Sequence, residues 1–205
     1  MCGRFCLSTN APQITEHFAL QNPPVLKPRY NIAPGQIIPV IRTAKQLDFL
    51  TWGFRPSWLK PEQNSFINAR LETIAEKPAF KQAFKSRRCL VIANGYYEWK
   101  LIGKHKQAYF ISLPQQEVFA LAAIWEQDTC AIITTIAAAN LAPLHARMPL
   151  VIPTAYYNSW LNHKKPIDDL DLYSQSNKLI FSASPVSTKV NNPLHDYIEC
   201  TKALQ

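Results

Sequence analysis

The sequence lacks an apolar run long enough to cross a bilayer. Its longer runs, such as Leu90–Ala93 and Val118–Trp125, fall far short of the roughly 20 residues that a membrane helix needs. It also lacks a signal-peptide hydrophobic region, a low-complexity segment and a proline-rich block between two halves. We therefore expect one soluble domain, residues 1–205, that is ordered from its first residues, has no membrane partner and lies in the cytoplasm.

The cysteines form no Cys-x-x-Cys pair, and no two histidines stand at metal-ligand spacing. The five cysteines are an odd number in a chain without a secretory signal, which argues against a disulfide framework. We therefore predict no metal site and no cofactor. The reducing cytoplasm is the compartment that suits these thiols.

Acidic residues are outnumbered, with 14 aspartates and glutamates against 22 lysines and arginines, a net charge of +8. An excess of this sign favours a polyanionic partner, because lysine and arginine neutralise phosphates and release counterions. Charge alone does not define a nucleic-acid site. Arginines and aromatic residues must also be placed around a plausible pocket.

The hydrophobic pattern predicts a mixed, mainly antiparallel α+β fold of short strands and short helices. Strands are expected at 37–41, 48–52, 88–93, 96–100, 107–112, 118–124, 130–135 and 179–183. Helices are expected from a capped start at Asn10-Ala11-Pro12, with proline in the first turn, to about Leu20, and at 72–75, 78–84 and 155–161, the last capped by Thr154. Asn94-Gly95 is a hairpin signal and predicts that 88–93 and 96–100 pair directly.

The second residue, Cys2, has unusual chemistry once the initiator methionine is removed. Its α-amine titrates near neutrality, at about 7.7–8.0, against about 10.4 for lysine. The amine can condense with an aldehyde, and the neighbouring thiol can close onto the imine carbon as a five-membered thiazolidine. The alternative is that Cys2 is an incidental residue of a disordered chain end.

Four other stretches contain side chains suited to a site. Asn68 and Arg70 stand before a helical pattern, where Asn68 could orient a reacting group or merely cap the helix. Glu98 follows a buried strand among aromatic residues, so it is either a carboxyl group with a raised pKa or a solvated strand residue.

His145 and Arg147 enter a Met-Pro turn, where they suit proton transfer and phosphate binding, with Thr134 as a hydroxyl partner. His145 could equally be a hydrogen-bonded structural group. Trp52 and Trp58 could stack on unpaired bases, although we expect one of the two to lie in the core.

Taken together and in order, these motifs resemble the SOS-response-associated peptidase family, also described as abasic-site processing proteins. The resemblance is carried by Met1-Cys2-Gly3-Arg4-Phe5, Tyr30-Asn31-Ile32-Ala33-Pro34-Gly35-Gln36, Trp52-Gly53-Phe54-Arg55-Pro56-Ser57-Trp58, Asn68-Ala69-Arg70, Gly95-Tyr96-Tyr97-Glu98-Trp99, His145-Ala146-Arg147-Met148-Pro149 and Val186-Ser187-Thr188-Lys189-Val190-Asn191-Asn192. It implies a strongly curved, barrel-like β core with short flanking helices.

The resemblance further implies that the protein recognises abasic sites in single-stranded DNA, including those at replication-fork junctions, and links itself to the sugar through Cys2. Glu98 would transfer protons, Asn68 would position Cys2, and His145 would help to open the sugar ring. The implied DNA-binding residues are Arg4, Pro34, Trp52, Arg70, Trp99, Thr134 and Arg147. The family name implies autocatalytic removal of Met1, which an aminopeptidase could also perform. We expect a monomer that associates with the nucleoid when it is bound to DNA.

Two other functions fit part of the sequence. Glutamine amidotransferases with an N-terminal nucleophile also begin Met-Cys-Gly, but they need a glutaminase pocket and usually a partner synthase domain. A non-catalytic single-strand binder would explain the charge and the aromatic residues. It would leave Cys2, Asn68, Glu98 and His145 unexplained.

Overall fold

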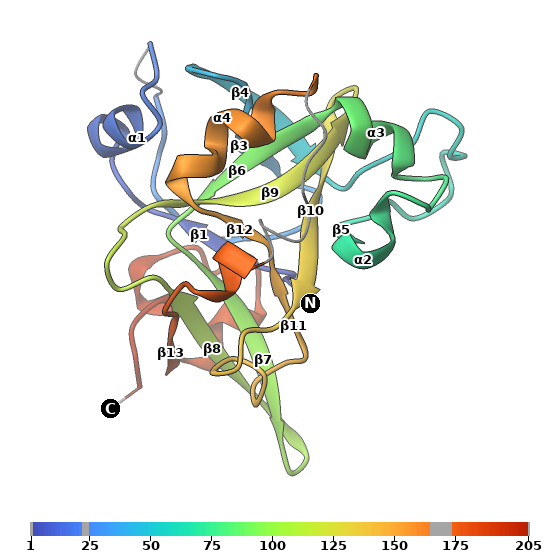
Figure 1. Ribbon diagram of the computed structural model, residues 1–205. Helices are drawn as coiled ribbons and strands as arrows, with labels where there is room; N and C mark the ends of the chain where they lie inside the picture. Colours follow the sequence, from blue (N-terminus) through green and yellow to red (C-terminus); the bar gives the residue numbers. More distant parts are fainter. Residues whose placement is uncertain (1, 22–24, 165–173, 205) are drawn as a thin grey trace.

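The computed structural model describes residues 2–21, 25–164 and 174–204. The core of the fold is a closed β barrel (Figure 1). Its strands are β3 (Ile37–Thr43), β4 (Gln46–Trp52), β6 (Arg88–Ala93), β9 (Phe119–Glu126) and β10 (Thr129–Ile136). Antiparallel pairs join β4 to β3, β3 to β6, β6 to β9 and β9 to β10. A parallel pair, Thr129 with Thr51 and Cys130 with Trp52, joins β10 back to β4 and closes the ring.

The apolar character of these strands explains why they form the barrel. Strand β6 is buried at every position, and β9 is buried from Phe119 to Ile124. A strand that is buried on both faces needs a continuous apolar run, as these segments have. The mainly antiparallel, barrel-like α+β fold expected from the sequence is therefore confirmed.

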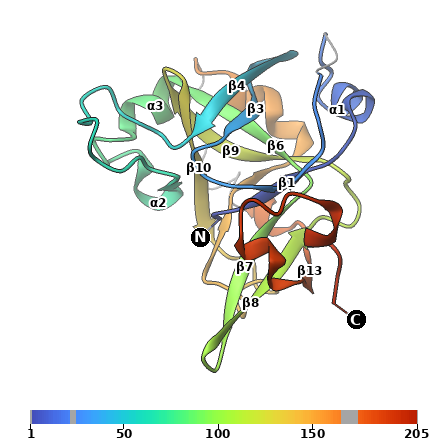
Figure 2. The same ribbon diagram turned by 180° about the vertical axis from the view of Figure 1, so that it is seen from behind.

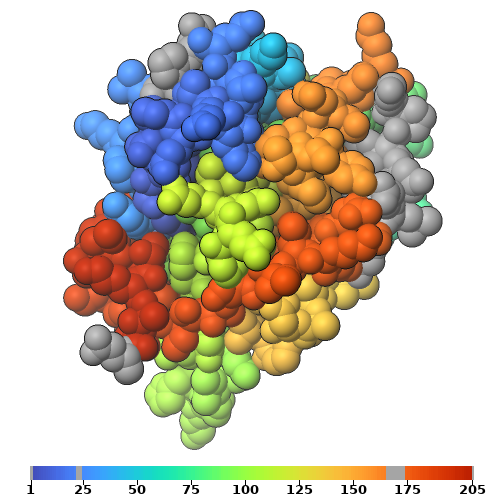
Figure 3. All heavy atoms as spheres, turned by 60° about the vertical axis from the view of Figure 1, so that its left-hand side comes forward, coloured from blue at the N-terminus to red at the C-terminus, as the bar shows by residue number. Residues whose placement is uncertain are grey.

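A second sheet lies against one end of the barrel (Figures 1 and 2). Its order is β13 (Ser182–Pro185), β8 (His105–Ser112), β7 (Gly95–Ile102), β1 (Phe5–Leu7) and β2 (Arg29–Ile32). Strands β7 and β8 continue beyond the sheet as a hairpin that projects from the body of the molecule, visible as a green arm in Figure 3. A small second core, which includes Tyr97, Val186 and Val190, packs between this sheet and the C-terminal segment.

Short elements complete the fold. Strands β5 (Asn68–Arg70) and β11 (Arg147–Pro149) pair with β10, and β12 (Val151–Ile152) pairs with β9. The helices are α1 (Ala11–His17), α2 (Leu71–Ile74), α3 (Lys81–Ser86) and α4 (Tyr157–Leu161), with 3-10 turns at Thr154–Tyr156, Thr188–Asn191 and Ile198–Cys200. No helix in the described ranges has the length and apolar character to span a membrane.

The predicted hairpin at Asn94-Gly95 is wrong. Strand β6 pairs with β3 and β9, whereas β7 pairs with β1 and β8 in the other sheet. The backbone of Gly95 is not in the left-handed region that a type I′ turn requires, and a Cβ on Gly95 would lie 2.4 Å from the Phe110 ring. Asn94 accepts hydrogen bonds from the backbone amides of Ser8 and Thr9. The dipeptide therefore connects a strand of the barrel to a strand of the second sheet, at a point where the backbone lies against the Phe110 ring.

Several element boundaries differ from expectation. Helix α1 begins at Ala11 as predicted, with the Asn10 side chain accepting from the Gln13 amide at 3.0 Å as its cap, but it ends at His17 rather than near Leu20. Helix α3 begins at Lys81 rather than at residue 78. Strand β13 begins only at Ser182. Thr154 does not cap a helix, since it lies inside a 3-10 turn that follows Pro153.

Candidate active site

Cys2 lies directly before β1, in the main core, and is fully buried. Asn68, the first residue of β5, donates a hydrogen bond from Nδ2 to the Cys2 carbonyl oxygen at 2.8 Å. The parallel pairing of Asn68 with Ile132 fixes this position on β10. Asn68 does not cap helix α2, whose N-cap is Arg70. Its Oδ1 atom is buried and has no hydrogen-bond partner in the described structure, so it remains available to a bound group.

Glu98 on β7 is 3 % exposed, which excludes the solvated strand position. Burial raises the pKa of its carboxyl group. The pKa of the Cys2 thiol is raised by burial and by the charge of Glu98. The thiol is therefore protonated at neutral pH, and Glu98 is a carboxyl group suited to exchanging protons beside it.

His145 lies in the loop between β10 and β11, and Arg147 begins β11. The Arg147 amide donates to His145 Nδ1 at 3.0 Å, and the same ring nitrogen lies 3.3 Å from the Arg147 carbonyl oxygen. The Arg147 guanidinium binds Glu72 through Nη2 at 2.9 Å and the Thr134 carbonyl oxygen at 2.7 Å. Arg147 is thus held between a carboxylate on α2 and strand β10.

An open cavity of about 440 Å³ adjoins these groups and is lined by Arg4, Glu98, Trp99, Lys106, His145 and Asn191. Arg4 donates to Asn31 Oδ1 at 2.7 Å and to the Val190 carbonyl oxygen at 2.8 Å, and its guanidinium lies 6.0 Å from the centre of the Trp99 ring. Its Nε atom is buried without a described hydrogen-bond partner. Three separated sequence motifs, those of Arg4, Trp99 and Asn191, therefore contribute to the lining of the cavity.

The remaining residues predicted to contact DNA differ in their exposure to solvent. Pro34 and Arg70 are exposed. Thr134 is fully buried and accepts from Arg147 Nε at 3.3 Å, so it orients that arginine rather than facing solvent. Trp52 is also fully buried, with its indole N–H bonded to the Ile67 carbonyl oxygen at 2.9 Å, and it presents no face to a base. Trp58, by contrast, is 59 % exposed.

Sequence reasoning missed four residues around this site. Lys106 and Asn191 line the cavity, and Asn191 Oδ1 accepts from Trp99 Nε1 at 2.7 Å. Glu72 pairs with Arg147. Tyr96 shares a face of β7 with Glu98, is fully buried, and has a hydroxyl without a described partner. Alternation along β7 could have identified Tyr96, but the contacts of the other three depend on tertiary pairing.

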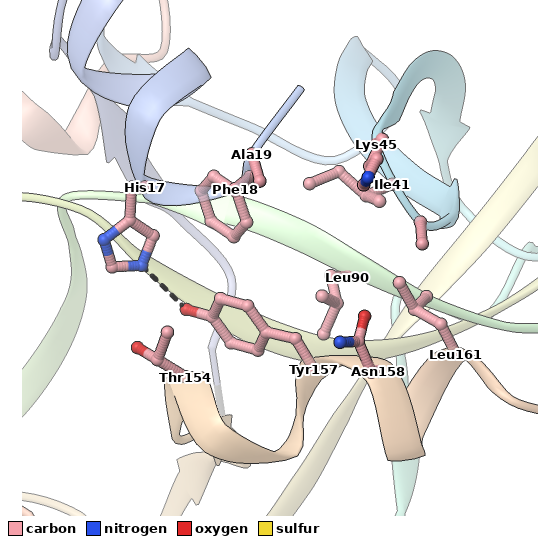
Figure 4. A pocket seen from close by; sticks show the side chains of 11 residues that line it. His17, Phe18, Ala19, Ile41, Lys45, Leu90, Thr154, Tyr157, Asn158 and Leu161 are labelled. Atoms are coloured by element: carbon pink, nitrogen blue, oxygen red, sulfur yellow. Dashed lines mark hydrogen bonds between the residues drawn. The ribbon is translucent and has the colours of Figure 1, made fainter. Parts of the chain in front are cut away.

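A second pocket, of about 200 Å³, lies between α1, the β3–β4 turn and α4 (Figure 4). Its most polar feature is a 3.0 Å contact between His17 Nε2 and the Tyr157 hydroxyl. None of the predicted site residues lines it. Over the described ranges, no group of three or more histidine, cysteine, aspartate or glutamate residues is arranged to hold a metal ion.

These features place the chain in a class of α+β proteins that combine a closed barrel with a second sheet and a buried cysteine shortly before the first strand. The chain belongs to the SOS response associated peptidase (SRAP) family, whose model matches residues 1–193. It is 35% identical to the abasic site processing protein YoaM of Bacillus subtilis, over 99% of this chain and 98% of that one. It is 30% identical to the abasic site processing protein YedK of Escherichia coli, over 94% and 95% of the two chains.

A solved structure from Bacteroides thetaiotaomicron has the same fold, with a TM-score of 0.84 at 22% identity and complete coverage of both chains. A phage-related protein from Bordetella bronchiseptica gives a TM-score of 0.72 at 26% identity, over 90% of this chain and 94% of that one. The fold and the family are thus established on independent grounds.

Proposed function

We propose that this protein processes abasic sites by capturing them covalently in single-stranded DNA through Cys2. The observation that carries the proposal is the position of Cys2. Its carbonyl oxygen accepts a hydrogen bond from Asn68, and the charge of Glu98, which lines the cavity, contributes to the raised pKa of its thiol. An abasic deoxyribose in its open form is an aldehyde, the electrophile that an aminothiol traps. The names of the relatives support abasic DNA as the substrate.

Met1 must first leave, through the protein's own peptidase activity or through an aminopeptidase, to free the Cys2 amine. His145 then donates a proton to the ring oxygen as the C1′ hydroxyl loses its own, which opens the sugar to the aldehyde. The amine nitrogen attacks C1′, the aldehyde oxygen takes up protons and leaves as water, and an imine remains. The sulfur adds to the imine carbon while the thiol proton ends on nitrogen. The net change is aldehyde plus aminothiol to thiazolidine plus one water, with Glu98 transferring the protons.

The cationic residues would hold the DNA around this centre. Arg4, Arg70 and Arg147 bind phosphates, with Thr134 orienting Arg147, while Pro34 and Trp99 contact the bases near the lesion. We assign no base contact to Trp52, because it is buried. The protein would act as a monomer on single strands and at fork junctions.

The proposal is tested with protein whose N-terminus is confirmed as Cys2 and a single-stranded oligonucleotide that contains one abasic site. We expect a DNA adduct on denaturing gels that is stable without borohydride and whose mass is the sum of both components less one water. Cys2→Ser keeps the amine but not the thiol, so its adduct should survive only after borohydride reduction. Cys6→Ser, which changes another buried thiol, should react like the wild type.

The other candidate functions give different results. A non-catalytic binder would bind the oligonucleotide but form no adduct, even with a free Cys2 terminus. An amidotransferase would release ammonia from glutamine and would form no adduct with the abasic oligonucleotide. Absence of any adduct would therefore overturn covalent capture and leave single-strand binding.

A further inference from the structure

We propose that the β7–β8 hairpin, residues 99–107, is a second part of the DNA interface. In this role it holds the sugar-phosphate backbone of the single strand on one side of the abasic site. The proposal rests on the proposed function and extends it from the lesion to the flanking nucleotides. Its support is geometric continuity with the cavity, unpaired positive charge, and exposed aliphatic residues at the tip.

The hairpin begins at the cavity and leads away from it. Glu98 and Trp99 line the cavity, and β7 runs on to Ile102, beyond the body of the molecule (Figures 1 and 3). Lys106 of β8 also lines the cavity and stands opposite Leu101 in the ladder. A strand of DNA whose abasic sugar enters the cavity would therefore meet the hairpin as it leaves.

One edge of β7 is open along this stretch. Strand β1 pairs with β7 only at Gly95 and Tyr96, followed by a bond from the Tyr97 amide to the Arg4 carbonyl oxygen at 2.9 Å. From Lys100 to Ile102, β8 is the only strand that pairs with β7 in the described structure. The open edge faces away from β8, so a ligand can lie along it without disturbing the hairpin.

The charge of the hairpin is positive and uncompensated. Residues 99–107 contain Lys100, Lys104, Lys106 and His105 but no aspartate or glutamate. None of the three lysines has an ion pair within the described ranges, whereas Arg29, Arg42, Arg87 and Arg147 each pair with a carboxylate. Unpaired lysines spaced along an extended segment suit a row of phosphates, since each one that binds releases counterions.

Lysines on an open strand edge also have a structural explanation, because they prevent edge-to-edge aggregation. That explanation does not account for Leu101 and Ile102, which are adjacent on the same edge strand and are 65% and 51% exposed. Exposed aliphatic residues at an open edge favour aggregation unless a partner covers them. Deoxyribose and base surfaces of a bound strand would cover them while the lysines hold its phosphates.

The test compares Lys100→Gln/Lys104→Gln with Lys81→Gln/Lys85→Gln, which removes the same charge from exposed positions on α3. Neither pair lines the cavity. Affinity is measured by anisotropy for single strands that contain a non-reactive tetrahydrofuran abasic analogue with long flanks on both sides, on the 5′ side only, or on the 3′ side only. Crosslinking rates are measured separately, at saturating DNA with a true abasic site.

We expect the hairpin variant to bind the two-flank strand about tenfold more weakly at 0.15 M salt and to lower the slope of log K against log salt by about 1.4, for two phosphate contacts. The same loss should occur with only one of the two one-flank strands, because the hairpin lies on one side of the cavity. The α3 variant should change neither quantity, and the crosslinking rate at saturation should stay at the wild-type value.

A second variant, Leu101→Ser/Ile102→Ser, tests the apolar tip. It should weaken binding of the same strands about threefold without changing the salt slope, because the contact is not ionic. Equal loss in the hairpin and α3 variants, equal loss with both one-flank strands, or wild-type affinity throughout would each overturn the hairpin proposal. Those results would leave covalent capture by Cys2 standing, since that is read from the adduct.

Discussion

The Asn68 side chain donates its Nδ2 hydrogen bond to the carbonyl oxygen of Cys2, 66 residues earlier in the chain. Asn68 itself is fixed by the pairing of β5 with β10, so the bond ties the N-terminal segment to the barrel. In the proposed reaction, this bond would hold the residue that carries both reactive groups.

Asn68→Ala should therefore slow crosslinking by about 10- to 100-fold, because a nucleophile displaced by about 1 Å loses much of the benefit of orientation. Non-covalent affinity for single strands should change little, since Asn68 carries no charge. Single-turnover crosslinking kinetics and anisotropy measure the two quantities. A variant that lost affinity and rate in the same proportion would show that Asn68 binds DNA rather than positions Cys2.

Glu98→Gln should slow crosslinking about 100-fold, the typical contribution of a general acid–base group, yet stabilise the fold at neutral pH. Burial raises the folded-state pKa of Glu98 above its ordinary value of 4.5. The folded state therefore binds this proton more tightly than the unfolded state does. Burial of the Glu98 charge lowers the free energy of unfolding of the wild type, and this cost is absent below pH 4.5 and grows as the pH rises through the folded-state pKa.

Melting temperatures of both proteins, measured from pH 4 to pH 7.5, test the direction of this pH dependence. The excess stability of Glu98→Gln over the wild type should be larger at pH 7.5 than at pH 4. A difference that is constant with pH would mean that Glu98 titrates alike in the folded and unfolded chains.

Glu72→Gln should raise affinity for single-stranded DNA about threefold at 0.15 M salt, because it releases one cation, Arg147, for a phosphate. Burial alone would raise the pKa of Glu72, but hydrogen bonds from Arg147 outweigh it and the net shift is downward, so the ion pair is present at neutral pH. Glu76→Gln removes the same charge from an exposed residue just beyond α2 and serves as the control. A loss of affinity in Glu72→Gln would show instead that Glu72 orients Arg147.

Local sequence patterns predict where the strands lie better than they predict which strands pair. The apolar runs of β6 and β9 identify them as buried strands, since such sequences are stable only with both faces covered. The sequence around Asn94-Gly95 has the same composition as a hairpin turn, however, and only the contact with Phe110 and the bonds to Ser8 and Thr9 show why it crosses between sheets. Those contacts are distant in sequence and have no local pattern.

The same limit applies to the site. The burial of Glu98 could be predicted from its aromatic neighbours, and that burial raises the pKa of its carboxyl group. Thr134 and Arg147 were both expected to face phosphates, but Thr134 is buried beneath Arg147, because β11 pairs with the end of β10. The partnership of Glu72 with Arg147 spans 75 residues and has no local sign.

Neighbouring tyrosines on β7 provide a final prediction about stability. Tyr96 and Tyr97 are both fully buried and face opposite sides of the strand. The Tyr97 hydroxyl donates to the Tyr30 carbonyl oxygen at 2.6 Å, whereas the Tyr96 hydroxyl has no partner in the described structure. Tyr97→Phe should therefore cost about 1–3 kcal/mol, and Tyr96→Phe should be neutral or stabilising, because it removes an unpaired buried hydroxyl.

Chemical denaturation of the two variants, with the wild type as reference, measures this difference. A cost at Tyr96 as large as at Tyr97 would mean that its hydroxyl has a partner in solution. Wild-type stability or better in Tyr96→Phe would show that the unpaired hydroxyl contributes nothing to the stability of the fold, because burying it without a hydrogen-bond partner costs free energy.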